Sequence, residues 1–201
     1  MKTKVDVISG FLGAGKTTLI KRLIADADPE ERLVILQNEH GIVEIENSEL
    51  EGIGASLEGI NSGCICCDMT GNFIQSIESI VEWTHPDRIL LEPSGVGRLS
   101  DILNILKNAC SQHVKVTGVV TVVDVCKFSL YLRNYRGFFD DQLKYAKCIL
   151  LSKTEKKNSE EIERIIRQIY ELNPDAVVLS SPLDKFSLGY MKECIRYQEA
   201  L

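Results

Sequence analysis

Eight residues near the N-terminus have the types and the spacing needed to hold a phosphate chain. They run from Gly10 to Thr17, read GFLGAGKT, and match the pattern G-x-x-x-x-G-K-T. Glycines at these positions let the backbone turn inward and present successive N–H groups to phosphate oxygens. Lys16 is expected to contact the β- and γ-phosphates of a nucleotide, and Thr17 to bind Mg²⁺ through its hydroxyl. The spacing therefore predicts a P-loop. The other residues expected to contact the nucleotide are Gly10, Gly13, Ala14, Gly15 and Thr18.

The residues on either side of this motif support the same interpretation. The apolar run at 5–8 is typical of a buried strand, and residues 18–24 have helical periodicity. A P-loop requires this order of strand, loop and helix. The alternative is a glycine-rich turn with an incidental lysine. The register of the whole motif together with both flanks favours nucleotide binding.

A second motif, Glu92-Pro93-Ser94-Gly95, follows the apolar run at 88–91. An acidic residue at the end of such a strand supports Mg²⁺ in P-loop proteins, either directly or through water. Glu92 is the candidate for that role, and the backbone N–H of Gly95 is placed to meet a γ-phosphate. The alternative is a plain turn at a strand end, for which proline, serine and glycine are also suitable residues.

A third motif, Ser152-Lys153-Thr154-Glu155, is a variant of the Asn-Lys-x-Asp pattern that reads guanine. In that pattern the carboxylate accepts hydrogen bonds from guanine N1–H and the exocyclic amine, while the lysine stem packs along the base. Adenine lacks this pair of donors, so Glu155 predicts a preference for GTP. Ser152 is shorter than asparagine, and Glu155 is one methylene longer than aspartate. A charged loop without a role in base recognition is the alternative.

Cys64, Cys66 and Cys67 place three thiols within four positions. Thiolates are soft ligands that favour Zn²⁺ or another thiophilic ion, and three protein ligands leave a coordination position for exchange. Adjacent cysteines do not readily form a disulfide with each other, although a redox role stays open. Glu39 and His40 are the candidates to complete the ligand set, and Glu39 is preferred because a single histidine there is more typical of a loop. The isolated cysteines are expected to fill small spaces in the core or on the surface. They are Cys110, Cys126, Cys148 and Cys194.

The elements that position these motifs alternate between strands and helices along the chain. Strands are predicted at 5–8, 33–37, 88–92, 114–125, 148–151 and 176–179. Helices are predicted at 15–26, 73–81, 99–106, 128–143, 160–172 and 188–197. This alternation predicts one α/β domain over residues 1–201, a P-loop NTPase with a mostly parallel sheet and helices on both faces. The strand at 88–92 is expected beside the P-loop strand. In such a sheet, ligands bind beyond the carboxyl ends of the strands, where all three nucleotide motifs lie. The glycine-punctuated region at 38–63 is expected to be a mobile loop with short strands, suited to a switch.

Composition narrows the function classes. The chain has 201 residues, is 44% hydrophobic and has a formal net charge of -6, which argues against a nucleic-acid partner because binding of that kind needs a basic face. It contains no apolar run long enough to span a membrane and opens without the pattern of a signal peptide. We therefore expect a cytoplasmic protein with reduced thiols and no membrane partner.

Taken in order, these motifs resemble the CobW-like family of P-loop GTPases, metallochaperone relatives of the hydrogenase and urease nickel-insertion GTPases. Residues 10–18, 38–41, 63–67, 92–95 and 122–124 carry the resemblance, which covers nearly the whole chain. It implies GTP hydrolysis coupled to the binding and delivery of a transition metal, often zinc or cobalt. The metal ligands implied are the three clustered cysteines and Glu39, in a switch region, and Lys16, Thr17 and Glu92 are implied as phosphate and Mg²⁺ residues.

The resemblance also implies partners. Many family members continue into a C-terminal domain and a histidine-rich stretch, whereas this chain is expected to hold the GTPase domain alone. Client recognition is then expected on another protein, the client being a metalloprotein or a cofactor-assembly enzyme. A second copy of the chain is also a candidate partner. The main alternative is a regulatory or metal-binding subunit that holds nucleotide without significant turnover. An ATP-using kinase of a small molecule is a weaker one, because the sequence shows no acceptor motif.

Overall fold

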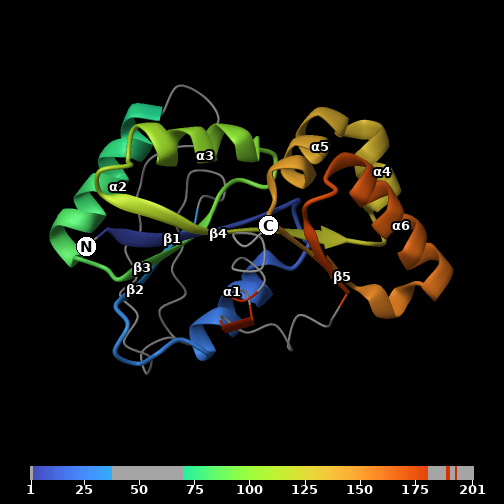
Figure 1. Cartoon of the computed structure of the whole chain (residues 1–201), viewed down its shortest axis with the longest axis horizontal. Helices are drawn as coiled ribbons and strands as arrows, with labels where there is room; N and C mark the ends of the chain where they lie inside the picture. Colours follow the sequence, from blue (N-terminus) through green and yellow to red (C-terminus); the bar gives the residue numbers. More distant parts are fainter. Residues whose placement is uncertain (1, 38–69, 181–188, 191–192, 194–201) are drawn as a thin grey trace.

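The structure is a computed structural model, and it describes residues 2–37, 70–180, 189–190 and 193. In these residues, six parallel strands form one sheet in the order β2-β3-β1-β4-β5-β6 (Figure 1). The predicted neighbourhood of the P-loop strand is confirmed, since β1 pairs with β3 on one side and β4 on the other. The strands are β1 (Thr3–Gly10), β2 (Leu33–Gln37), β3 (Arg88–Glu92), β4 (Val114–Asp124), β5 (Cys148–Ser152) and β6 (Val177–Leu179).

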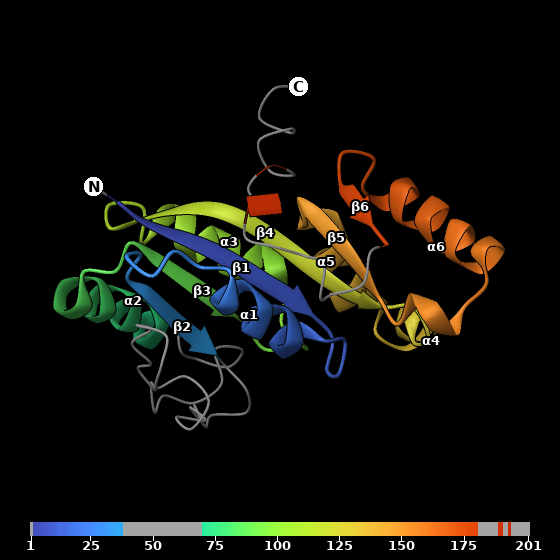
Figure 2. The same ribbon diagram turned by 90° about the horizontal axis from the view of Figure 1, so that it is seen from below.

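Helices cover both faces of the sheet, as the alternating pattern predicts. They are α1 (Lys16–Ala25), α2 (Thr70–Thr84), α3 (Leu99–Asn108), α4 (Phe128–Asn134), α5 (Arg136–Tyr145) and α6 (Ser159–Leu172), with a short 3₁₀ helix at Thr154–Lys156. One core cluster joins α1 to the sheet, and two others join α2 and α3, then α4, α5 and α6, to its opposite face. Figure 2 shows α1 in front of the sheet and α3 and α5 behind it.

The burial of the strands follows from this covering. Every residue of β3 and of β5 is buried. Their near-continuous apolar sequences are typical of parallel strands enclosed on both faces. In β1, Ile8 packs in the cluster around α1, whereas Val5 and Val7 pack in the cluster around α2 and α3. Successive side chains of one strand therefore supply both halves of the core.

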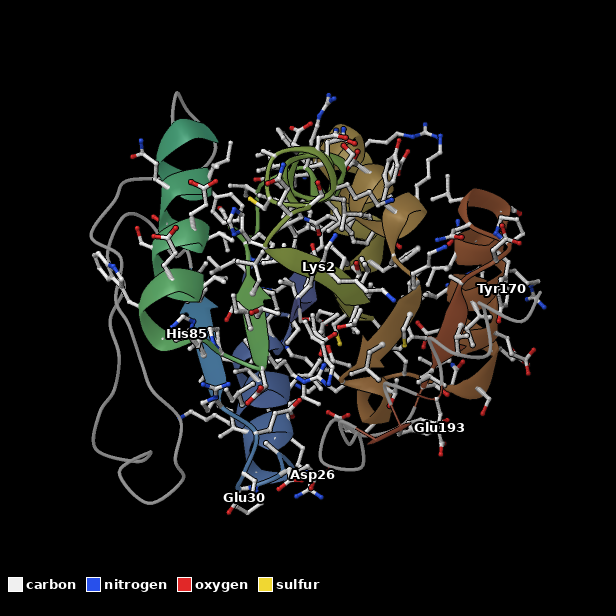
Figure 3. The ribbon with its side chains drawn as sticks, turned by 60° about the vertical axis from the view of Figure 1, so that its left-hand side comes forward. Lys2, Asp26, Glu30, His85, Tyr170 and Glu193 are labelled. Atoms are coloured by element: carbon white, nitrogen blue, oxygen red, sulfur yellow. The ribbon has the colours of Figure 1, made fainter. Side chains whose placement is uncertain are left out.

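Helix ends bring the chain back to the sheet by local turns. After α2 the residue His85, labelled in Figure 3, has a left-handed backbone with φ of 44° and leads into Pro86. Left-handed residues of this kind commonly end helices. Asp26 and Glu30, also labelled, lie near the C-terminal end of α1.

No helix among the residues described here is long and apolar enough to cross a membrane.

The single helix predicted at 128–143 is wrong, because the structure has two helices that meet at Tyr135. This residue leaves the helical conformation with φ of −132° and ψ of 28°. Its N–H donates to Tyr131 O at 2.9 Å to end α4, and its carbonyl accepts from Phe139 N at 2.9 Å to begin α5. The bend packs rings of both helices around Phe11. Periodicity could not locate the break, since the aromatic residues keep a four-residue spacing across it.

Other boundaries agree with the prediction to within a few residues, except where the prediction lies outside the described residues. That is the case for the region at 38–63 and for most of the terminal helix at 188–197, of which residues 189, 190 and 193 are described and helical.

The expectation that isolated cysteines fill small spaces can be tested by alkylation. Cys110 and Cys148 are buried and Cys126 is exposed. Burial raises the pKa of the Cys110 thiol from 9.0 to about 11, because the thiolate would lose its hydration, and Glu78 adds to the shift. At pH 8 this leaves about a hundredfold less thiolate than in an unperturbed thiol. We expect iodoacetamide to modify Cys126 in the native protein at least a hundredfold faster than Cys110, measured by peptide mass mapping.

Comparable rates for the two cysteines in the native protein would contradict this packing, and comparable rates in urea are the control.

The raised pKa of Cys110 also makes the stability of the folded state depend on pH. Because the folded state holds the thiol proton more tightly than the unfolded state, this contribution to stability is complete below about pH 9 and is lost as the pH rises through about 11.

Candidate nucleotide-binding site

The predicted P-loop lies between the carboxyl end of β1 and the start of α1, as its motif requires. Gly10 is essential for a steric reason, because a Cβ at this position would lie 2.4 Å from Val122 O on the neighbouring strand. Gly15 is the N-cap of α1, with φ of 107° and no side chain to cap the helix. The first turn of α1 also contains no acidic residue. Its N–H groups and the positive end of the helix dipole are therefore suited to an anion.

Lys16 and Glu92, predicted from separate motifs, lie together beside this loop. Lys16 Nζ is 3.5 Å from Glu92 Oε1, and the two side chains are 4% and 0% exposed. Lys16 also donates to Phe11 O at 3.4 Å, and Gln37 Nε2 donates to Glu92 Oε2 at 2.6 Å. Gln37 was not predicted to belong to the site, although it ends β2 at the same edge of the sheet. The buried cation and carboxylate stabilise each other, because either charge alone would have a large desolvation cost.

Gly95 lies directly against the P-loop backbone. A Cβ on Gly95 would be 3.0 Å from Leu12 N, 3.2 Å from Gly10 O and 3.3 Å from Phe11 C. A side chain here would require these backbone atoms to shift by a few tenths of an ångström, so glycine suits the position. Thr17 and Thr18 are exposed in the first turn of α1, where their hydroxyls are accessible. The structure thus brings the Glu92-Pro-Ser-Gly95 motif next to the predicted phosphate-binding residues.

The motif predicted to read guanine is attached to the same loop. Ser152 Oγ donates to Ala14 O at 2.7 Å and to Val123 O at 3.3 Å. Lys153, with a left-handed φ of 58°, donates from Nζ to Gly13 O at 3.0 Å. Glu155 is exposed in the 3₁₀ helix that follows. The serine that stands in place of asparagine therefore holds a P-loop carbonyl.

Asp124 lies in the run at 122–124 that carries the family resemblance, and the sequence predicts no role for it. Its side chain is buried, and Oδ2 accepts a hydrogen bond from Lys153 Nζ at 2.5 Å. Oδ1 accepts from Cys126 N at 2.9 Å, which fixes the carboxylate. The hydrogen bond to Asp124 is the main reason that the pKa of Lys153 is raised. The signal that could have identified Asp124 is its position, because it pairs in register with Ser152.

Aromatic side chains on α4 and α5 support the P-loop from outside the motif. Phe11 is 4% exposed, and its ring stacks on Tyr131 with centroids 4.3 Å apart. The ring of Phe139 packs edge-on against the ring of Phe11, with centroids 5.6 Å apart. Tyr131 also donates from its hydroxyl to Leu12 O at 3.4 Å. Phe11, an apolar residue within the P-loop, is therefore buried against α4 and α5.

The predicted metal ligands Glu39, Cys64, Cys66 and Cys67 lie outside the described residues. Within the described ranges, no group of three or more histidine, cysteine, aspartate or glutamate side chains is arranged to hold a metal ion. The metal site therefore remains a prediction from sequence.

Together, the parallel sheet, the glycine loop at the end of β1 and the buried lysine beside it define a P-loop nucleotide-binding domain. Residues 4–180 match the family model described as "CobW/HypB/UreG, nucleotide-binding domain". The chain belongs to this family, which confirms the resemblance inferred from its motifs.

Named relatives add detail. The chain is 33% identical over 177 residues to the zinc chaperone YeiR of Escherichia coli K12, covering 85% of this chain and 52% of that protein. It is 28% identical over 186 residues to the zinc-regulated GTPase metalloprotein activator 1 of Schizosaccharomyces pombe, covering 88% of this chain and 45% of that protein. The chain spans about half the length of these relatives.

Solved structures agree on the fold. The Zn(II)-bound YjiA GTPase from E. coli has a TM-score of 0.71 at 21% identity, over 97% of this chain and 62% of that one. The hydrogenase maturation factor HypB from Archaeoglobus fulgidus has a TM-score of 0.60 at 18% identity, over 99% and 89% of the two chains. The α/β P-loop fold predicted from sequence is thus confirmed.

Proposed function

We propose that this chain is the nucleotide-binding domain of a GTPase metallochaperone. It binds GTP, hydrolyses it slowly, and couples the nucleotide state to the binding of a transition metal that it delivers to a client metalloprotein or a cofactor-assembly enzyme. The observation that carries the proposal is the convergence of the Lys16–Glu92 pair, Gly95 and the residues of the Ser152 motif on one P-loop. The names of the relatives, zinc chaperones and a GTPase metalloprotein activator, support the metal part.

The phosphate end of the site supplies suitable partners for GTP. The N–H groups of residues 13–18 would surround the β-phosphate, and Lys16 would turn from Glu92 toward the β- and γ-phosphates. The backbone of Gly95 would meet the γ-phosphate. Thr17 and Glu92 fit Mg²⁺, because a hydroxyl and a carboxylate are the hard oxygen ligands that this ion takes, directly or through water. When bound, Mg²⁺ would neutralise charge on the phosphates.

The base end of the site gives a direct test of guanine preference. Glu155→Ala is expected to weaken GTP binding by about 2 kcal/mol, because two donors on the base would lose a charged acceptor. ATP binding should hardly change. The two affinities can be compared by titration calorimetry, with Glu160→Ala, which removes an exposed glutamate from the first turn of α6, as the matched control. If the wild-type protein binds ATP as tightly as GTP, Glu155 does not select the base.

For the metal, the proposed ligands are Cys64, Cys66, Cys67 and Glu39. We propose zinc as the first candidate, since three thiolates suit it and the relatives are named for it, with cobalt as the second. In the sequence the cysteines directly precede α2, which packs on the sheet beside β2 and β3. On the other side of this segment, Glu39 follows by two positions Gln37, whose side chain donates to Glu92, so a short stretch of chain links the proposed metal ligands to the nucleotide site.

The overall proposal is tested by steady-state phosphate release from GTP, measured with and without Zn²⁺ or Co²⁺. Slow release that changes with metal is the expected result. Nucleotide binding without measurable release under any of these conditions would favour a regulatory or metal-binding subunit instead. Release from ATP at the same rate as from GTP would exclude a guanine-specific enzyme.

A further inference from the structure

Gln142 on α5 is a buried side chain that holds the segment following β3. It is 0% exposed, and its Nε2 donates to Gly95 O and to Gly97 O, each at 3.1 Å. Its Oε1 accepts no hydrogen bond from the described part of the protein. An amide with an unpaired buried oxygen is unfavourable as a core residue. The favourable contacts of this amide are therefore the two hydrogen bonds from its nitrogen to the carbonyls of Gly95 and Gly97.

We call residues 93–98 the 93–98 loop. The loop lies between two supports, with the P-loop backbone against Gly95 on one side and α5 on the other. Within it, Gly97 N donates to Ser94 O at 3.0 Å and closes a turn. Just beyond it, Ser100 donates from N and Oγ to Asp141 at 3.0 and 2.7 Å. Neighbouring residues of α5 thus hold the loop and the first turn of α3.

The directions of the loop's N–H groups follow from its carbonyls. In a planar trans peptide the C=O and the next N–H point in opposite directions. Gln142 fixes the carbonyl of Gly95, so the N–H of Val96 points away from α5. The turn fixes the carbonyl of Ser94, which in the same way sets the N–H of Gly95. The carbonyls of residues 94, 95 and 97 are all engaged, so this stretch has little freedom to rotate.

We propose that Gln142 is a positioning residue for the γ-phosphate: it holds the 93–98 loop so that the backbone N–H groups at Gly95 and Val96 are set for a third phosphate. The inference rests on the proposed binding of GTP. GDP lacks the group that this loop would meet. Gln142 therefore contributes to the difference in affinity between GTP and GDP, and much less to nucleotide affinity in general.

The chemistry of the contact explains why glutamine suits this position. An amide nitrogen carries two hydrogens, so it can donate one to each of two carbonyl oxygens. A carboxylate at the same place has no hydrogen to donate and would face two acceptors. Thr121 Oγ1 donates to the backbone carbonyl of Gln142 at 3.0 Å, which ties this point of α5 to β4. This hydrogen bond helps to fix the backbone position from which the Gln142 side chain reaches the 93–98 loop.

The test compares Gln142→Leu and Gln142→Glu with the wild type. Affinities for GDP and for a non-hydrolysable GTP analogue are measured with Mg²⁺ by fluorescence titration between pH 6 and pH 9. Gln142→Leu is expected to lower affinity for the analogue by about tenfold, the effect of one or two lost hydrogen bonds, and to change GDP affinity less than about threefold. The ratio of the affinity for the analogue to the affinity for GDP, here called the analogue-to-GDP ratio, should be lower in Gln142→Leu than in the wild type by the same factor at every pH.

Gln142→Glu adds a readout that a loss of packing would not produce. A protonated carboxyl can donate one hydrogen bond to Gly95 O or Gly97 O, and an ionised one cannot. The analogue-to-GDP ratio of this variant should therefore be highest at pH 6 and fall as the pH rises and the proton is lost. The wild type and Gln142→Leu should lack this added fall with pH.

Asn173→Ala is the control for general destabilisation. Asn173 donates from Nδ2 to the carbonyls of Leu143, Lys144 and Ala146 at the C-terminal end of α5, and its side chain donates no hydrogen bond to the 93–98 loop. Its loss should lower the melting temperature and leave the ratio unchanged. An unchanged ratio in Gln142→Leu, or an equal fall in Asn173→Ala, would overturn the proposal. A wild type that binds neither nucleotide would instead overturn the proposed function.

Discussion

Replacing Lys16 with alanine is expected to abolish tight GTP binding, with a loss of at least a hundredfold in affinity. The substitution removes the fixed cation predicted to contact the β- and γ-phosphates in a partly desolvated site, where a charge-assisted contact is worth most. The structure adds a second expected effect. Glu92 is 0% exposed and lies 3.5 Å from Lys16 Nζ, so the variant would leave a buried carboxylate without this cation. We expect it to lose about 3–5 kcal/mol of stability.

The two effects of Lys16→Ala can be separated by a double variant. Lys16→Ala with Glu92→Gln removes both charges, so it should recover much of the stability lost by the single variant, measured by urea denaturation. GTP binding should stay lost, because neither residue of the pair remains. If the double variant is stable and binds GTP with the affinity of the wild type, the assignment of the phosphate site to this loop is wrong.

Replacing Cys66 and Cys67 together with serine is expected to reduce Zn²⁺ affinity by about a thousandfold or more. Two of the proposed thiolate ligands would be lost, and structural zinc sites derive about 10–16 kcal/mol from a full set of ligands. Affinity is measured by competition with a chromophoric chelator. Because thiols lose protons on binding zinc, the wild type should release protons and bind more weakly at acid pH. Cys126→Ser, which removes an exposed cysteine beside the nucleotide site, is the matched control.

The same titration tests the coupling between metal and nucleotide. We expect Zn²⁺ affinity to differ between the apo, GDP-bound and GTP-analogue-bound protein by about 5- to 150-fold. The coupling must be reciprocal, so zinc must change the affinity for the GTP analogue by the same factor. Equal zinc affinity in all three states would leave two independent sites and remove the chaperone mechanism. Wild-type zinc affinity in the double cysteine variant would exclude these two cysteines as ligands.

Sequence reasoning could predict much of the fold because the strands carry unambiguous signals. The buried run of β3 and the valine-rich β4 can be recognised without knowledge of tertiary structure, and the P-loop fixes which strand comes first. The break at Tyr135 could not be predicted, because it depends on rings that pack around a residue more than a hundred positions away. Local periodicity carries no information about such a contact.

The same distinction applies to the candidate site. Lys16, Glu92 and Gly95 belong to motifs whose spacing has a direct chemical meaning, and the structure places them together. Gln142 belongs to no short motif, and Asp124 belongs to the run at 122–124, whose spacing assigns it no chemical role. Each acts on a loop from a different part of the chain, so its use appears only when the distance between side chain and backbone is known. Residues that position a site are harder to predict than residues that contact a ligand.

The hydrogen bonds from Ser152 and Lys153 to the P-loop carbonyls have a consequence for how this domain can change over evolutionary time. Each of these residues belongs to the motif that would recognise the base, yet each is attached to the loop that would hold the phosphates. A substitution that alters base preference at these positions would also disturb phosphate affinity. A lineage that exchanged one base for another would therefore need compensating substitutions in the P-loop, or would have to make the exchange through Glu155, whose side chain is exposed in the 3₁₀ helix.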